Sequence, residues 1–132
     1  MIIADSSALI SLLIETDQNH QKAIVASQAI QHRSDTVIIP EDVFSEVMNV
    51  LGKKFDHKKA VAVAALLSDS KVFSIENTTE KIRQTALKKF EKQKQSVSFT
   101  DCVVMACADA LYTKEIFGFD KIFSQQRYKL LE

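Results

Sequence analysis

Met1-Ile2-Ile3-Ala4-Asp5 opens the chain, and this short apolar run ends at a carboxylate. Successive apolar side chains with no polar residue between them are typical of a strand that is buried on both faces of a sheet. The stretch therefore predicts a β-strand over residues 2–5. A carboxylate held against a hydrophobic core is costly unless something compensates its charge, so Asp5 is the first candidate functional residue.

Strands and helices alternate along the rest of the sequence. Further strands are predicted over residues 36–39, before Pro40, and over residues 72–75 and 115–119. Helices are predicted over residues 6–14, 19–32, 41–54, 58–67, 79–92 and 99–112, with a short helix or coil over residues 125–131. This alternation indicates an α/β protein whose mainly parallel sheet is covered on both sides. We expect a single domain over residues 1–132.

The composition narrows the class of protein further. A hydrophobic content of 46% with 26% charged residues excludes a disordered chain, and 2 glycines with 1 proline argue against an all-β protein rich in tight turns. The 17 basic and 17 acidic residues cancel to a formal net charge of zero. Binding to nucleic acid would therefore need a local basic patch or bound metal ions.

The two cysteines and the lack of a targeting signal indicate the cellular compartment of the protein. Cys102 and Cys107 fall on one predicted helix, where five positions place them about 140° apart around the axis, so they cannot pair. We interpret them as buried thiols in a reducing compartment. No apolar run reaches the length of a membrane span, and no signal-peptide pattern precedes the first strand. We expect a cytoplasmic protein with no membrane contact.

Three further acidic residues lie at the edges of apolar elements. Glu46 falls at the margin of the apolar face of its helix, Asp101 opens a nearly all-apolar helix, and Asp120 follows an aromatic run. In open parallel sheets the active site lies beyond the carboxyl ends of the strands, where the strand order reverses. Asp5 and Asp120 both follow predicted strands, so we expect them to meet although 115 positions separate them. Asp101 begins a helix at the same edge.

Each acid also has an ordinary structural interpretation. Asp5 can start a turn or cap a helix, and Asp120 can be a turn residue. Asp101 follows Ser98 by three positions, which is the spacing of a capping box. Glu46 can be a solvated helix residue. The functional hypothesis depends on the joint pattern, because each acid flanks a different buried element.

Four converging carboxylates would need a cation to remain ionised together. Hard oxygen ligands of this kind suit Mg²⁺ or Mn²⁺, and four of them would fit one or two ions. Such a site supports hydrolysis of a phosphodiester by metal-activated water, without a side-chain nucleophile. We therefore expect a metal-dependent phosphodiester hydrolase, in agreement with the lack of a defensible Ser-His-Asp or Cys-His pattern.

The four segments around these acids resemble the signature segments of PIN domains. They are Ile-Ile-Ala-Asp-Ser-Ser-Ala (2–8), Val-Phe-Ser-Glu-Val (43–47), Ser-Phe-Thr-Asp-Cys-Val-Val-Met-Ala (98–106) and Ile-Phe-Gly-Phe-Asp-Lys-Ile-Phe (116–123). The likeness extends over essentially the whole chain, in order and at suitable spacing. Chain size and architecture are similar to the stand-alone VapC-type toxins of toxin–antitoxin pairs.

This resemblance implies a three-layer α/β/α fold with a mainly parallel sheet of four or five strands. It implies a Mg²⁺- or Mn²⁺-dependent endoribonuclease, the toxin of a type II pair, with a cognate antitoxin and a homodimeric state. The catalytic and metal-binding residues map onto Asp5, Glu46, Asp101 and Asp120. Ser7 matches a supporting hydroxyl residue. One departure is Gly118, where the family commonly has Thr or Ser two positions before the last aspartate.

Other interpretations remain open at this point. The chain can be a catalytically weak PIN-like module that binds RNA or a protein. A phosphotransfer receiver or small phosphatase would need a lysine after a late strand, for which Lys121 is a poor candidate. Lys53 is the basic residue that we expect to contact RNA near Glu46, and the lysines at positions 88–94 suit a solvated helix end.

Overall fold

Five parallel strands form the central sheet of the computed structural model, which describes residues 1–131. The strands are β1 (Ile2–Ala4), β2 (Val37–Pro40), β3 (Phe73–Glu76), β4 (Glu115–Phe117) and β5 (Lys129–Leu131). Their order across the sheet is β3-β2-β1-β4-β5, and each neighbouring pair is parallel. The predicted α/β class with a mainly parallel sheet of four or five strands is confirmed.

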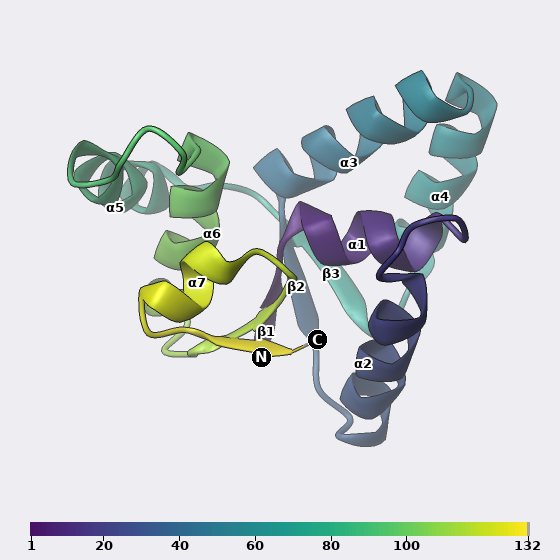
Figure 1. Cartoon of the computed structure of the whole chain (residues 1–132), viewed down its shortest axis with the longest axis horizontal. Helices are drawn as coiled ribbons and strands as arrows, with labels where there is room; N and C mark the ends of the chain where they lie inside the picture. Colours follow the sequence, from purple (N-terminus) through teal and green to yellow (C-terminus); the bar gives the residue numbers. More distant parts are fainter. Residues whose placement is uncertain (132) are drawn as a thin grey trace.

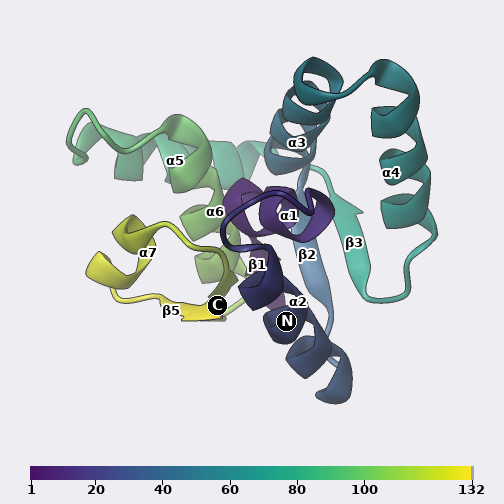
Figure 2. The same ribbon diagram turned by 45° about the vertical axis from the view of Figure 1, so that its right-hand side comes forward.

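Seven helices cover the two faces of this sheet in the described part of the chain (Figures 1 and 2). They are α1 (Ser6–Leu13), α2 (His20–His32), α3 (Glu41–Lys54), α4 (His57–Asp69), α5 (Glu80–Glu91), α6 (Phe99–Ala110) and α7 (Lys121–Gln125). Helices α1 to α4 connect strands on one side of β1 and lie on one face, whereas α5 to α7 lie on the other. This follows from right-handed crossovers that run first toward β3 and then toward β5. The result is the expected three-layer arrangement.

The hydrophobic core explains why the central elements form where they do. All three residues of β1 are fully buried, as a strand between two helical layers requires. Helix α6 buries seven consecutive residues from Cys102 to Ala108, which confirms that the most apolar helix is central. Neither cysteine is bonded to the other, as predicted. Among the described residues, no helix has the length and apolarity that crossing a membrane demands.

The C-terminal end differs from the expectation of a short helix or coil over residues 125–131. The structure has helix α7 before this segment and strand β5 within it, and Ile116 of β4 pairs with Leu130 of β5. A strand of three residues has too little periodicity to be recognised, and here the backbone of β4 supplies its partners. The preceding strand also ends at Phe117 rather than Phe119, because the Phe119 N–H donates to Ser7 instead of a strand.

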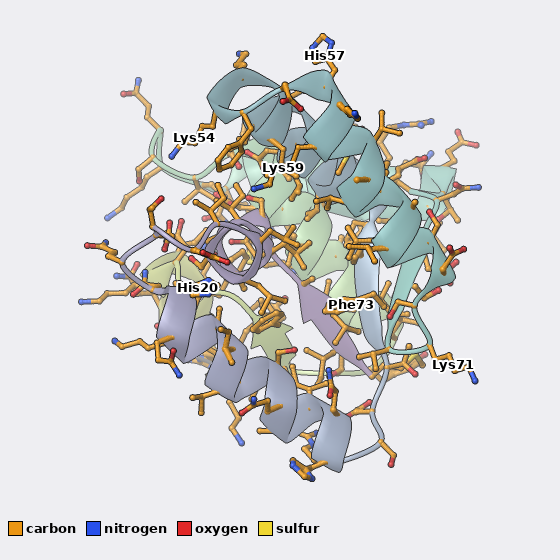
Figure 3. All side chains as sticks on the ribbon, turned by 90° about the vertical axis from the view of Figure 1, so that its right-hand side faces the viewer. His20, Lys54, His57, Lys59, Lys71 and Phe73 are labelled. Carbon is orange, nitrogen blue, oxygen red and sulfur yellow. The ribbon has the colours of Figure 1, made fainter. Side chains whose placement is uncertain are left out.

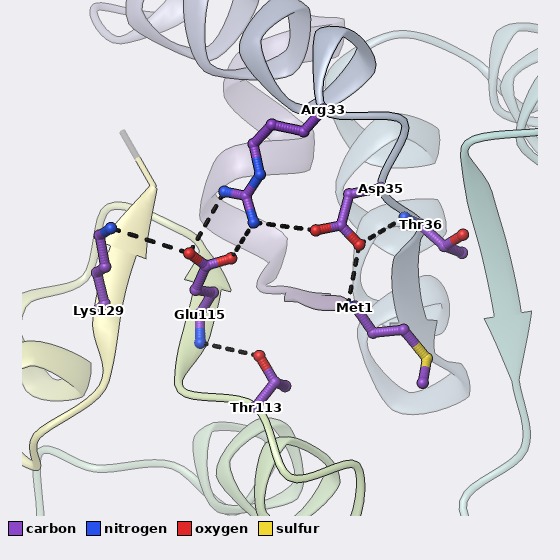
Figure 4. Close-up of polar contacts among 7 residues, drawn as sticks. All are labelled: Met1, Arg33, Asp35, Thr36, Thr113, Glu115 and Lys129. Carbon is purple, nitrogen blue, oxygen red and sulfur yellow. Dashed lines mark hydrogen bonds and ion pairs between the residues drawn. The ribbon is translucent and has the colours of Figure 1, made fainter.

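Several ion pairs lie at the amino ends of the strands (Figure 4). The Arg33 guanidinium, just after α2, donates to both oxygens of Glu115 at 2.7 and 3.3 Å and to Asp35 at 3.0 Å. Lys129 of β5 lies 3.9 Å from the same Glu115 carboxylate. Such exposed pairs contribute little stability. They lie at the opposite end of the sheet from Asp5.

Candidate active site

The strand order reverses between β1 and β4, the two central neighbours of the sheet. The chain leaves β1 toward β2 on one side, whereas β4 connects onward to β5 on the other. A crevice beyond the carboxyl ends of the strands at such a reversal is the usual ligand site of open α/β sheets. Asp5 directly follows β1, and Asp120 follows β4 by three residues. The pairing of Ala4 with Phe117 brings both to one edge.

Asp5 is held in place by Ser7. Asp5 is only 4% exposed, and its Oδ2 accepts bonds from the Ser7 hydroxyl at 2.6 Å and the Ser7 N–H at 3.2 Å. The same hydroxyl accepts a bond from the Phe119 N–H at 3.0 Å. Ser7 therefore connects the carboxylate after β1 to the loop after β4, and so fixes Asp5 relative to the segment that contains Asp120.

Burial raises the pKa of Asp5 from its ordinary value of 3.8 to about 6. The hydrogen bonds from Ser7 act in the opposite direction, because they stabilise the ionised form. The negative charges of Asp101 and Glu46 raise the pKa further. Asp5 is thus an incompletely compensated buried carboxyl that lies within electrostatic reach of two other acids.

Asp101 lies in the first turn of α6 and is half-buried. It forms the predicted capping box: its Oδ2 accepts the Ser98 N–H at 2.9 Å, and its own N–H donates to the Ser98 hydroxyl at 3.0 Å. Burial raises its pKa, and the charges of Asp120 and Glu46 add to this effect. Through their effects on Asp5 and Asp101, all four candidate acids belong to one electrostatic cluster.

Glu46 and Asp120 are the solvent-facing members of the cluster. Glu46 is exposed on α3, which begins directly after the carboxyl end of β2, and its charge affects both Asp5 and Asp101. Asp120 is also exposed, and its Oδ1 caps α7 by accepting the Ile122 N–H at 3.0 Å. The two exposed acids therefore open the cluster to solvent, and hence to a ligand.

The capping interpretations describe the local structure of three acids correctly. Asp5, Asp101 and Asp120 each cap or support a helix start, but each uses one carboxylate oxygen in the bonds described above. Within residues 1–131 the second oxygen of each has no hydrogen-bond partner. As they stand, no three acidic, His or Cys side chains of the described residues enclose a position for a metal ion. Ligation would therefore require these side chains to rotate.

Gly118 lies against Asp5, which gives its presence a steric reason. A Cβ at this position would lie 3.1 Å from the Cβ of Asp5 and 3.6 Å from its Oδ2. The first distance is tighter than ordinary contacts, so a Thr or Ser here would displace Asp5 slightly. The Ser7 hydroxyl bonds both Asp5 and Phe119, the residue after Gly118.

Lys53 does not lie among the acids. It is exposed near the end of α3, on the same stripe of the helix as Glu46 and about 10 Å further along the axis. The sequence pattern did not lead us to predict a role for Phe55, whose exposed aromatic ring comes two residues after Lys53. An aromatic residue within a lysine-rich turn between two helices is the signal that could have identified it.

Comparisons with known proteins agree with this geometry. A family model described as PIN domain matches residues 2–127. VapC20 of Mycobacterium tuberculosis, described as a sarcin-ricin loop cleaving toxin, has a TM-score of 0.83 at 22% identity, over 98% of this chain and 97% of its own. A toxin–antitoxin complex from Klebsiella pneumoniae gives 0.70 at 15% identity, over 100% and 97%. Comparison with curated protein sequences finds no match. The structural likenesses establish the shared fold.

Proposed function

The chain belongs to the PIN domain family, and on that premise we propose that residues 1–132 form a Mg²⁺- or Mn²⁺-dependent endoribonuclease. The observation that supports this most strongly is the electrostatic cluster at the strand reversal. Four acids from four different elements meet there, and the charges of three of them raise the pKa of Asp5 or Asp101. A bound cation would favour the ionised forms of Asp5 and Asp101, whose pKa values are raised without one.

The residues present fit a hard divalent ion. Asp5, Glu46, Asp101 and Asp120 would hold one or two such ions, since carboxylate oxygens are the ligands that Mg²⁺ and Mn²⁺ prefer. Asp5, Asp101 and Asp120 each have an oxygen outside their capping bonds. When bound, the ion would acidify water and neutralise charge on the phosphate oxygens.

The protein's own residues prepare this site. Ser7 orients Asp5 through two hydrogen bonds and fixes the loop before Asp120 through a third. The capping box holds the start of α6, and with it Asp101, at the same edge. Supporting hydrogen bonds of this type keep ligating carboxylates in a productive orientation.

The structural neighbours support the biological setting of the proposal. One is described as a toxin that cleaves the sarcin-ricin loop, and the other as a toxin–antitoxin complex. We therefore propose that this chain is a cytoplasmic toxin of a type II pair. Its substrate would be RNA, its regulator a cognate antitoxin protein, and its own assembly a homodimer.

Cleavage of RNA in the presence and absence of metal tests the activity. We expect fragments with Mg²⁺ or Mn²⁺, no fragments with EDTA, and no fragments from the Asp5→Asn or Asp101→Asn chain. Asp69→Asn, at the end of α4, is a matched control that should cleave normally. Full activity of the Asp5→Asn/Asp101→Asn double variant would refute the proposal.

A second candidate function is a catalytically weak module that binds RNA or a protein. The observation that favours it is that the acids of the described chain do not enclose an ion as they stand. The two functions differ in metal binding. RNA binding without any heat of Mn²⁺ binding would favour the weak module over the nuclease.

A further inference from the structure

A basic surface lies at the turn between α3 and α4, away from the acidic cluster. Residues 53–59, here called the basic tip, contain four lysines and one aspartate, in a chain whose formal net charge is zero. The lysines are Lys53, Lys54, Lys58 and Lys59, and all four are exposed. Figure 3 shows Lys54, His57 and Lys59 in the upper part of the molecule, with Lys71 beyond the other end of α4.

We infer that the basic tip binds the single-stranded RNA that reaches the acidic cluster, with lysines on its phosphates and Phe55 stacked on a base. This inference rests on the proposed function, because it assigns the surface that holds the substrate of the same site. It concerns residues that lie outside the four acids and outside the bonds that orient them.

The charges of the basic tip are available to a polyanion. Among residues 1–131, none of its four lysines takes part in an ion pair. Its one acid, Asp56, caps α4 by accepting the Lys59 N–H at 2.7 Å. A chain without net charge attracts nucleic acid through a local excess of positive charge or through bound metal ions. The basic tip supplies that excess.

Phe55 gives the basic tip a surface for a base. The residue is 43% exposed, although a phenyl ring would be more stable in the core. The Lys59 ammonium lies 4.0 Å from the centre of its ring. Aromatic rings next to basic side chains are how proteins bind single-stranded nucleic acid, because every base has a face that can stack.

The α3 helix leads from the basic tip to the acidic cluster. Glu46, Asn49 and Lys53 lie at positions i, i+3 and i+7, so they form one stripe along the helix. The stripe from Glu46 to Lys53 is about 10 Å long. A strand that contacts Lys53 therefore needs only a short run of nucleotides to place a phosphate at the acids.

The alternative ligand for this region is an acidic peptide rather than RNA. Such a peptide would occupy a hollow between α3 and α4. Its volume is about 520 Å³, and it is lined mainly by apolar side chains such as Phe44, Met48 and Val61. Of the four lysines of the basic tip, only Lys53 lines it. The other three lie outside the hollow. The distribution of charge thus favours a ligand on the outer surface of the tip over a peptide within the hollow.

Binding of a short fluorescein-labelled single-stranded RNA of mixed sequence, followed by fluorescence anisotropy, tests the inference. All variants are made in the full chain with Asp5→Asn, so that cleavage does not interfere. We expect Lys53→Ala/Lys58→Ala/Lys59→Ala to weaken binding about tenfold or more near 0.1 M salt. The slope of log affinity against log salt should fall by about 2, since each lost phosphate contact on a single strand removes about 0.7.

Two further sets of variants test base stacking and the location of the binding surface separately from the total charge. Phe55→Ala should weaken binding about fivefold or more while the salt slope stays unchanged, and Phe55→Tyr should restore binding. The control Lys22→Ala/Lys71→Ala/Lys81→Ala removes three exposed lysines from α2, from the turn before β3 and from α5. It should bind RNA nearly as well as its parent.

Three outcomes would overturn the inference. The tip triple variant could bind RNA no worse than the control triple variant, or Phe55→Ala could leave binding unchanged. The tip triple variant could also keep RNA binding but lose binding of a poly-glutamate peptide, which would assign the surface to a protein. If the unsubstituted chain still cleaves RNA in any of these cases, the nuclease proposal stands. If tip-dependent binding occurs and the unsubstituted chain does not cleave RNA, the nuclease proposal fails and the basic tip is an RNA-binding surface that serves no cleavage site.

Discussion

Asp5→Asn should make the metal-free protein more stable above pH 7, even though it removes a residue at the proposed active site. Burial raises the pKa of Asp5 from 3.8 to about 6 in the folded chain. Below pH 3.8 the carboxyl is protonated in both the folded and unfolded states, and it has no effect on the pH dependence. Between pH 3.8 and about pH 6 the folded state holds the proton more tightly than the unfolded state. The free energy of unfolding therefore falls as the pH rises through this range.

The magnitude follows from the same two values. A difference of about two pH units corresponds to ~3 kcal/mol of stability that is lost by about pH 7. Asn cannot ionise, and its side-chain oxygen can still accept the bond from Ser7. The variant should therefore gain up to ~3 kcal/mol at pH 8, which is about 10 °C in Tm for a chain of this length. Near pH 4 the two proteins should have similar stability.

Thermal unfolding followed by circular dichroism in EDTA, from pH 4 to pH 8, measures this effect. Asp69→Asn, on the end of α4, controls for the loss of one carboxylate elsewhere. Mg²⁺ at 100 times its dissociation constant should restore about 2.7 kcal/mol to the unsubstituted protein and nothing to the variant. A variant that is less stable by the same amount at every pH would show that Asp5 acts only as a helix cap and that its pKa is not raised in the folded protein.

Three further substitutions test residues that position the candidate acids, without changing the acids themselves. Ser98→Ala removes the hydroxyl that accepts the Asp101 N–H and should cost ~1 kcal/mol in urea unfolding. RNA cleavage should be retained, because the backbone N–H of residue 98 still donates to the Asp101 carboxylate; loss of cleavage would contradict this. Gly118→Ser introduces a Cβ that lies 3.1 Å from the Cβ of Asp5. It should slow RNA cleavage clearly while the Tm changes only slightly. Faster cleavage would contradict the steric argument. Ser7→Ala leaves the Phe119 N–H without its partner and should cost ~1–3 kcal/mol in thermal unfolding; an unchanged Tm would argue against the bridge.

The sequence predicted most elements because their patterns are long. Helix α3 was predicted with its observed bounds, Glu41 to Lys54, since its apolar face repeats over several turns. Strand β5 was missed because three residues offer no period, and α7 because five residues form little more than one turn. Strand β5 depends on a tertiary contact, its pairing with β4, whereas α7 begins at a local cap from Asp120.

The site could be predicted in outline but not in detail. Asp5 and Asp120 follow strands that are neighbours in the sheet, so general rules for parallel sheets were enough to expect them at one edge. The bridge from Ser7 to Phe119 connects residues 112 positions apart, and no sequence pattern encodes it. The close approach of Gly118 to Asp5 likewise depends on how β4 leaves the sheet.

Titration calorimetry with Mn²⁺ tests most directly whether the four acids form one cation site. We expect the unsubstituted chain to bind one or two ions. Asp5→Asn and Asp101→Asn should each abolish or strongly weaken binding, whereas Asp69→Asn should not. Failure of the unsubstituted chain to bind Mn²⁺ would contradict this expectation. So would binding that persists unchanged in the Asp5→Asn/Asp101→Asn chain.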